Sequence, residues 1–222
     1  MEWDLDNVEV RVLGALIEKE TTTPEYYPIT LNGLTTACNQ KSNRNPVVCF
    51  DEKAVVRTLD GLRERQLVRV VSGAEMRVPK YYQLFVARLQ LSPPQVATLN
   101  VLMLRGPQTV GEIRGRSGRL HEFADLAEVD EALRELEERE EGPLVKELPR
   151  QSGRKENRYA HLLSGEPELV EEEEGEARLE PAALEVRAEN ERIAQLEGEV
   201  AQLRRDLDEL AAVFAEFKKQ FE

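Results

Sequence analysis

The chain has 222 residues, of which 41% are hydrophobic and 33% are charged, and its formal net charge is −13. This length allows one to three small domains with buried cores, and no apolar run approaches the roughly 18 residues of a membrane-spanning helix. The N-terminal residues are acidic and lack the apolar segment of a secretory signal, and the two cysteines form no C-x-x-C pair. We therefore expect a cytoplasmic protein with no membrane partner.

The negative charge is concentrated towards the C-terminus. Residues 1–90 carry 12 acidic and 12 basic side chains, and residues 91–165 carry 13 and 11, whereas residues 166–222 carry 18 and 7. The first two segments are close to neutral, so each can present a local basic surface although the whole chain is acidic. The net charge therefore does not exclude a nucleic-acid partner.

The first part of the chain is predicted to form a winged helix, in which a helix-turn-helix is followed by a β-hairpin. Apolar residues at helical spacing predict three helices, over residues 6–19, 31–38 and 51–66. Two strands are predicted over residues 67–71 and 81–84, and residues 27–29 can supply a short third strand. Thr30 is expected to cap the second helix at its N-terminus.

Residues 91–163 repeat this order of elements. Helices are predicted over residues 93–105, 110–116 and 126–141, and strands over residues 144–148 and 158–163. The inward-facing residues of the two third helices align at a shift of 74, as Val55, Leu59 and Leu62 with Val129, Leu133 and Leu136. An internal duplication is the simplest explanation, and it predicts two tandem winged helices.

The C-terminal part of the chain has a heptad pattern. Apolar residues recur every seven positions from Leu179 to Phe221, and a second apolar series follows the same period with one interruption at Glu189. This pattern predicts a coiled coil, and we expect a homodimer through residues 179–222. The alternative is that the apolar seam folds back along the winged helices of its own chain.

The predicted fold class is α+β and mostly helical. It comprises winged-helix domains over residues 1–89 and 90–165, an acidic linker over residues 166–178 and a coiled-coil helix over residues 179–222.

A run of polar residues separates the second and third predicted helices. This polar turn, residues 39–45, consists of Asn39, Gln40, Lys41, Ser42, Asn43, Arg44 and Asn45. Amide and guanidinium groups can read base edges or bind phosphates, so the turn is a candidate site for nucleic acid or for a protein partner. The alternative is a hydrated loop whose asparagines cap neighbouring backbone groups.

The third predicted helix is the candidate recognition helix. Its outward-facing bases are Lys53, Arg57 and Arg63, but Asp60 and Glu64 share that surface. The tips of the two hairpins add the candidate contacts Arg77, Arg154 and Lys155.

No catalytic, metal or cofactor site is predicted. His121 and His161 are the only histidines and lie in different elements, and the two cysteines are not at the spacing of zinc ligands. Cys38 is expected to be an ordinary buried thiol. We expect the protein not to be an enzyme.

Several segments resemble the YceH-like family of bacterial proteins, and they are residues 5–20, 22–24, 27–28, 31–34 and 37–44. The residues from Cys38 to Arg44 match the family pattern one by one, and a looser likeness continues to about Leu163. The resemblance implies a tandem winged-helix fold in a bacterial cytoplasm, and it implies no particular activity.

Two functional hypotheses follow. The first is a DNA-binding, transcription-regulator-like protein in which the third helix enters the major groove and a dimer addresses two half-sites. The second is an adaptor that uses winged-helix surfaces to bind proteins. At the level of fold alone, it would be similar to the accessory subunits of chromosome-condensing complexes.

Overall fold

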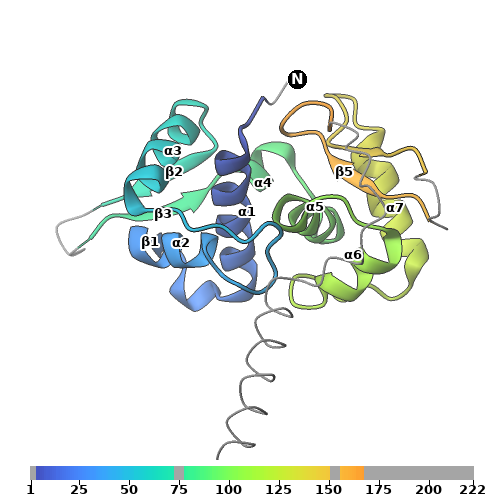
Figure 1. Cartoon of the computed structure of the whole chain (residues 1–222), viewed down its shortest axis with the longest axis horizontal. Coiled ribbons are helices and arrows are strands. Elements are labelled where there is room, and N and C mark those ends of the chain that lie inside the picture. The colour runs from blue at the N-terminus through green and yellow to red at the C-terminus, as the bar shows by residue number, and fades with distance from the viewer. Residues whose placement is uncertain (1–3, 73–77, 151–155, 168–222) are drawn as a thin grey trace, which may run out of the picture. The chain divides into compact units, whose positions relative to one another are not determined.

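The computed structural model describes residues 4–72, 78–150 and 156–167 (Figure 1). This part of the chain is α+β and mostly helical, with seven α-helices and five short strands. The predicted coiled coil over residues 179–222 lies outside the described residues. So do all but the first two residues of the predicted linker and the hairpin-tip residues Arg77, Arg154 and Lys155.

The first half of the described chain contains four helices and a small antiparallel sheet. Its elements are α1 (Asn7–Thr22), the 3-10 helix η1 (Pro24–Tyr26), β1 (Ile29–Thr30), α2 (Leu31–Cys38), α3 (Glu52–Glu64), β2 (Val68–Val71) and β3 (Lys80–Gln83). The strand order is β1-β3-β2, with Ile29 opposite Tyr81 and Val68 opposite Gln83. The predicted hairpin and its third strand are therefore present.

The second half is joined to the first by a helix that the sequence pattern did not predict, α4 (Phe85–Leu89). Five residues are too few for a helical period to be recognised, but Phe85 and Leu89 are both buried in the core. The elements that follow are α5 (Pro93–Arg105), α6 (Val110–Ser117), α7 (Leu126–Glu137), β4 (Val145–Glu147) and β5 (Tyr159–His161). Gln108 adds an isolated bridge to Tyr159 of β5.

Two helix ends differ from their predicted positions. α1 continues to Thr22, since the hydroxyls of Thr21, Thr22 and Thr23 each donate to the carbonyl four residues earlier. α7 ends at Glu137 rather than at residue 141. Residues 138–141 are acidic apart from Arg139, and negative charge at a helix C-terminus opposes the helix dipole.

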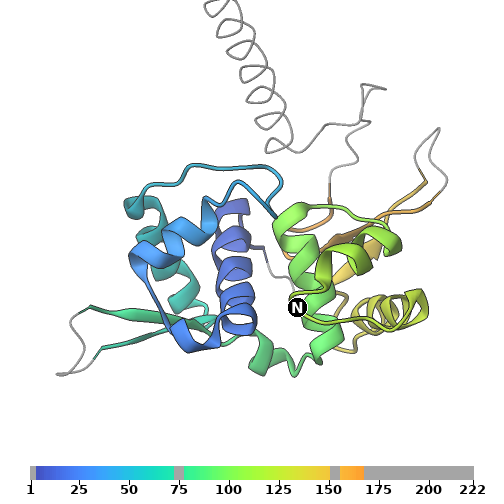
Figure 2. The ribbon, with the colours of Figure 1, turned by 90° about the horizontal axis from the view of Figure 1, so that it is seen from below.

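Helices α1 and α5 lie side by side at the centre of the described unit (Figures 1 and 2). The sequence predicted one buried stripe on α1, but every residue from Glu9 to Ile17 is buried. The reason is that α2 and α3 cover one side of α1 and α5 covers the other. Gly14 permits this approach, because a Cβ there would lie 3.0 Å from Cδ2 of Leu104.

The two halves anchor their hairpins in the same way. The backbone hydrogen bonds are Leu67 N to Leu62 O and Leu84 N to Leu67 O in the first half, and Leu144 N to Leu136 O and Leu162 N to Leu144 O in the second. The six residues that the sequence aligned at a shift of 74 are all at most 2% exposed. Their predicted inward orientation is confirmed.

Candidate functional site

The polar turn runs from the end of α2 across the side of α1 to reach α5, and the chain then returns to α3 (Figures 1 and 2). At its far end the backbone N–H of Asn45 donates to the carbonyl of Leu104, at 2.9 Å. The turn therefore touches both halves of the described unit.

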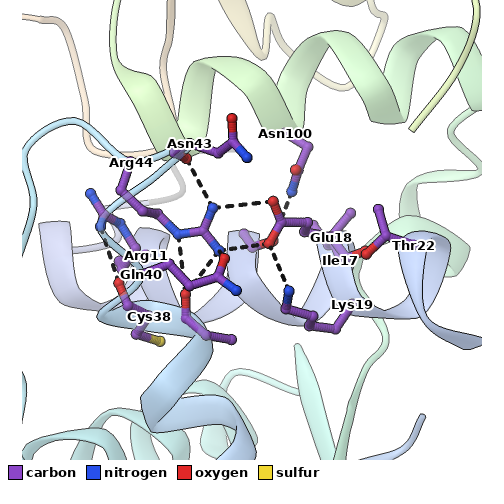
Figure 3. A network of polar contacts seen from close by, with 12 residues as sticks. Arg11, Ile17, Glu18, Lys19, Thr22, Cys38, Gln40, Asn43, Arg44 and Asn100 are labelled. Carbon is purple, nitrogen blue, oxygen red and sulfur yellow. Dashed lines mark hydrogen bonds and ion pairs between the residues drawn. The ribbon is translucent and has the colours of Figure 1, made fainter. Parts of the chain in front are cut away.

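Arg44 is the most buried polar residue of this turn, at 1% exposed. Its guanidinium grips both carboxylate oxygens of Glu18 on α1, with N···O distances of 2.6 and 3.1 Å (Figure 3). It also donates to the carbonyls of Ala37 and Asn43, at 2.8 and 2.9 Å, and to Oε1 of Gln40, at 3.0 Å. The N–H donors of the Arg44 guanidinium are therefore all directed at acceptors within the protein.

A second buried arginine lies beside the first. Arg11 of α1 is 5% exposed and donates to the carbonyls of Cys38 and Pro46, at 3.3 and 2.8 Å. Burial and the neighbouring charge of Arg44 lower the pKa of Arg11 from its usual value. The two arginines thus tie both ends of the polar turn to the same helix.

Glu18 supplies the negative charge that allows the guanidinium of Arg44 to be buried. Burial raises the pKa of the Glu18 carboxyl, but the hydrogen bond and the charge of Arg44, with a contribution from Lys19, outweigh it, and the net pKa is lowered. Glu18 is therefore ionised in the folded protein and balances the buried Arg44. Removing one partner of such a pair leaves an uncompensated buried charge.

The asparagines of the polar turn also serve the fold. The side chain of Asn39 exchanges two hydrogen bonds with the backbone of Phe50, both at 2.8 Å. Asn43, in the left-handed region at φ 59°, accepts a hydrogen bond from the guanidinium of Arg105 on α5. These contacts match the hypothesis that asparagines cap neighbouring groups, whereas Lys41 and Ser42 remain at the surface.

This placement changes how Arg44 is interpreted. As a candidate contact it was expected to reach a partner directly, but its guanidinium is enclosed and fully engaged. The sequence could not show this, because the carboxylate that binds Arg44 lies 26 positions earlier in the chain. Arg44 is a positioning residue for the polar turn.

The outer surface of α3 carries the remaining described candidates. Lys53 and Arg57 are exposed, one helical turn apart, and make no hydrogen bond or ion pair within the residues that the structure describes. Arg63 is exposed too, but it pairs with Asp60 at 3.0 Å. The opposite side of the helix buries Val55, Leu59 and Leu62.

A small hollow, of about 40 Å³, lies where α1, the polar turn, α5 and α6 meet. Arg105, Arg116 and Arg119 line it together with Glu18, Asn43 and Asn100. Sequence reasoning did not select these arginines, because they come together with the turn only through the packing of α5 and α6.

Cysteine and histidine side chains are dispersed. Cys38 is fully buried, as expected, and burial raises the pKa of its thiol to about 12, which makes it unreactive. His121 contacts Glu128 at 2.9 Å, and His161 lies in β5. Within residues 4–72, 78–150 and 156–167, no three His, Cys, Asp or Glu side chains are placed to hold a metal ion.

In the same described ranges, no helix is long and apolar enough to cross a membrane.

Comparison with known proteins places these features in a family. The family model DUF480, described as a protein of unknown function, matches residues 5–154. A UPF0502 protein of Geobacter sulfurreducens is 58% identical over 222 residues, which is the full length of both chains. UPF0502 proteins of Geotalea uraniireducens and Solibacter usitatus are 58% and 50% identical, again over the full length of both chains.

Proposed function

The chain belongs to the DUF480 family, whose bacterial members carry the name UPF0502, and from that premise we propose that it is a non-enzymatic pair of winged-helix modules that binds double-stranded DNA through α3. The proposal describes a regulator-like protein that acts as a dimer. Its support comes from the order of the elements, from the surface of α3 and from the heptads of the sequence.

The order of elements supports two winged helices. In each half, three helices precede an antiparallel hairpin, and a short segment before the second helix pairs with the last strand. The second helix is capped by Thr30 in one half and by Thr109 in the other, and the third helix by Asp51 and by Asp125. The same capping residue types at equivalent places favour one fold used twice.

The observation that carries the DNA proposal is the pair of unengaged bases on α3. Lys53 and Arg57 point away from the core on the helix that would enter the major groove, and no carboxylate within the described residues holds either of them. Side chains of this kind can neutralise phosphates or bind guanine edges. Arg63 contributes less, because Asp60 already binds it.

The second module does not share this surface. At the shift of 74, Lys53, Arg57 and Arg63 correspond to Ala127, Glu131 and Glu137 of α7. Helix α7 carries five acidic residues and one basic residue, whereas α3 carries three of each. Phosphates would be repelled by α7, so we assign the DNA contact to the first module alone.

Binding of the full-length protein to a labelled mixed-sequence duplex tests this assignment. We expect the affinity to fall as salt rises, and the double variant Lys53→Gln/Arg57→Gln to bind more weakly, with a log–log salt slope smaller by about 1.8. The control is Arg134→Gln on α7, which should leave binding unchanged. If the wild-type protein shows no binding to duplex at low salt, or a flat salt response, it does not act through DNA.

A protein partner is the second candidate, and one observation favours it. The α3 surface has equal numbers of acids and bases and exposes Val56 at 36%. A mixed surface with an apolar residue at its centre suits a protein adaptor better than it suits a uniformly charged phosphate backbone. A lysate protein that stays bound after nuclease treatment and is lost with Val56→Ser would favour the adaptor over DNA.

The dimer is proposed from the sequence heptads alone, since residues 179–222 lie outside the described part of the chain. Light scattering on the full-length protein should give twice the mass of one chain. A monomer at tens of micromolar would remove the dimer from the proposal.

A further inference from the structure

The hollow beside the polar turn is lined by side chains from segments far apart in the sequence. Glu18 and Thr22 come from α1, and Asn43 comes from the polar turn. Arg105 is the last residue of α5, Arg116 lies on α6, and Arg119 lies in the loop after α6. None of these residues belongs to α3, so the hollow is separate from the DNA contact proposed above.

Positive charge dominates the walls of this hollow. Three arginines line it, against a single carboxylate. Arg105 is 8% exposed and bound to Asn43, and Arg116 is bound to Gln108 and lies 3.7 Å from Glu112. Arg119 is exposed and makes no hydrogen bond or ion pair within the described residues. One guanidinium is therefore available at the rim, while the other two are held in place.

The carboxylate in the wall does not oppose an anion strongly. Arg44 binds both oxygens of Glu18, and Lys19 lies 3.6 Å from one of them. Arg44 and Lys19 both lie against the carboxylate of Glu18, so its charge is already balanced within the protein (Figure 3). The hollow therefore has three guanidinium groups in its walls against one carboxylate that is already paired.

Two amide side chains complete the lining. The Oδ1 of Asn43 is occupied by Arg105, and its Nδ2 has no acceptor among the described residues, so it is an available donor. Asn100 is 1% exposed; its Nδ2 donates to the carbonyl of Gly14 at 2.8 Å, and its Oδ1 has no partner in the described part of the chain. Because that oxygen is enclosed, Asn43 is the amide that can meet a ligand in the hollow.

We propose that this hollow binds one phosphate group, either as inorganic phosphate or as a phosphate monoester. Arg119 and Nδ2 of Asn43 donate to the phosphate oxygens, and the charges of Arg105 and Arg116 stabilise the dianion. The volume of about 40 Å³ suits a single small group and excludes a bulky organic ligand from the interior.

Calorimetric titration of the full-length protein tests the proposal, with sodium phosphate, phenyl phosphate and sodium sulfate as separate ligands at constant ionic strength. We expect saturable phosphate binding that weakens about tenfold in Arg119→Gln, since one charge-assisted hydrogen bond is lost. The control is Arg114→Gln, an exposed arginine of α6 that lies five residues before Arg119 and outside the hollow, and it should change the affinity less than twofold.

Each outcome decides a part of the proposal. Binding of phenyl phosphate at least as tight as that of inorganic phosphate indicates an ester as the ligand, and binding of inorganic phosphate alone indicates the free ion. Sulfate has the shape and charge of the phosphate dianion, so tighter binding of sulfate than of phosphate would contradict phosphate as the ligand. No saturation by tens of millimolar phosphate, or equal losses in Arg119→Gln and Arg114→Gln, would overturn the site, whatever the result with DNA.

Discussion

The two halves of the described chain share a backbone plan and differ in how their helix connections are held. In the first half, 13 residues join α2 to α3, and a buried arginine anchors them. In the second half, eight residues join α6 to α7, and the buried Phe123, which forms a T-shaped ring pair with His121, anchors them. The polar pair of that connection, His121 with Glu128, is partly exposed.

This difference separates the features that the two halves share from those in which they differ. Hairpin anchoring and the inward-facing residues of α3 and α7 recur because they build the core of each half. The exposed charges of the two third helices differ: α3 is balanced and α7 is acidic. Binding properties are therefore expected to differ between the halves even where the backbone agrees.

The largest expected effect comes from the first connection. Arg44→Ala should lower the free energy of unfolding by about 3–5 kcal/mol, because the largely buried Glu18 would lose the guanidinium that binds both of its oxygens and keep only the longer contact with Lys19. His121→Ala, its counterpart in the second connection, should cost about 1 kcal/mol or less. Urea denaturation measures both. If the double variant Arg44→Met/Glu18→Leu is no more stable than Arg44→Ala, the lost charge balance is not the cause.

The shared core should respond equally in both halves. Leu62→Ala and Leu136→Ala each remove a fully buried side chain that lies at the same place in its half. We expect a loss of about 2–5 kcal/mol for each, similar within about 1 kcal/mol. Thermal and urea unfolding would show this. A several-fold difference between the two would mean that the halves are not packed alike.

The pH dependence between pH 7 and 5 should come from the second half, which holds both histidines. Burial lowers the pKa of His161 to about 4, so the neutral form is favoured in the folded protein. Above the pKa of about 6.5 that the imidazole has in the unfolded chain, its protonation does not affect stability. As the pH falls from 7 to 5, the unfolded chain takes up a proton that the folded protein does not, and the free energy of unfolding falls by about 2 kcal/mol. In His161→Gln that loss should largely disappear, and an unchanged pH profile would contradict the assignment.

The smallest expected effect concerns the caps of the second helices. Thr30 accepts from the backbone N–H of Gly33, and Thr109 from that of Glu112, in both cases at 3.2 Å. Thr30→Ala and Thr109→Ala should each cost about 1 kcal/mol. Replacement by serine is the control, because it keeps the accepting hydroxyl and should restore most of the loss.

Local sequence was sufficient wherever the determining residues lie within a few positions of one another. The Thr30 cap, the strands of the first hairpin and the buried faces of α3 and α7 were all predictable, because capping and periodicity act over one or two helical turns. The resemblance to a bacterial family, based on motifs between residues 5 and 44, is likewise confirmed by the DUF480 match.

Tertiary structure decided the rest, because it depends on contacts between residues far apart in the chain. A polar turn rich in amides predicts exposure, yet Arg44 is buried, since the turn folds back onto a carboxylate 26 residues away. Helix α1 is enclosed on all sides because α5 packs against Gly14 across a separation of 86 residues. Burial of a charge and the assembly of the arginine-lined hollow depend on which helices meet, and periodicity within a single helix carries no information about that choice.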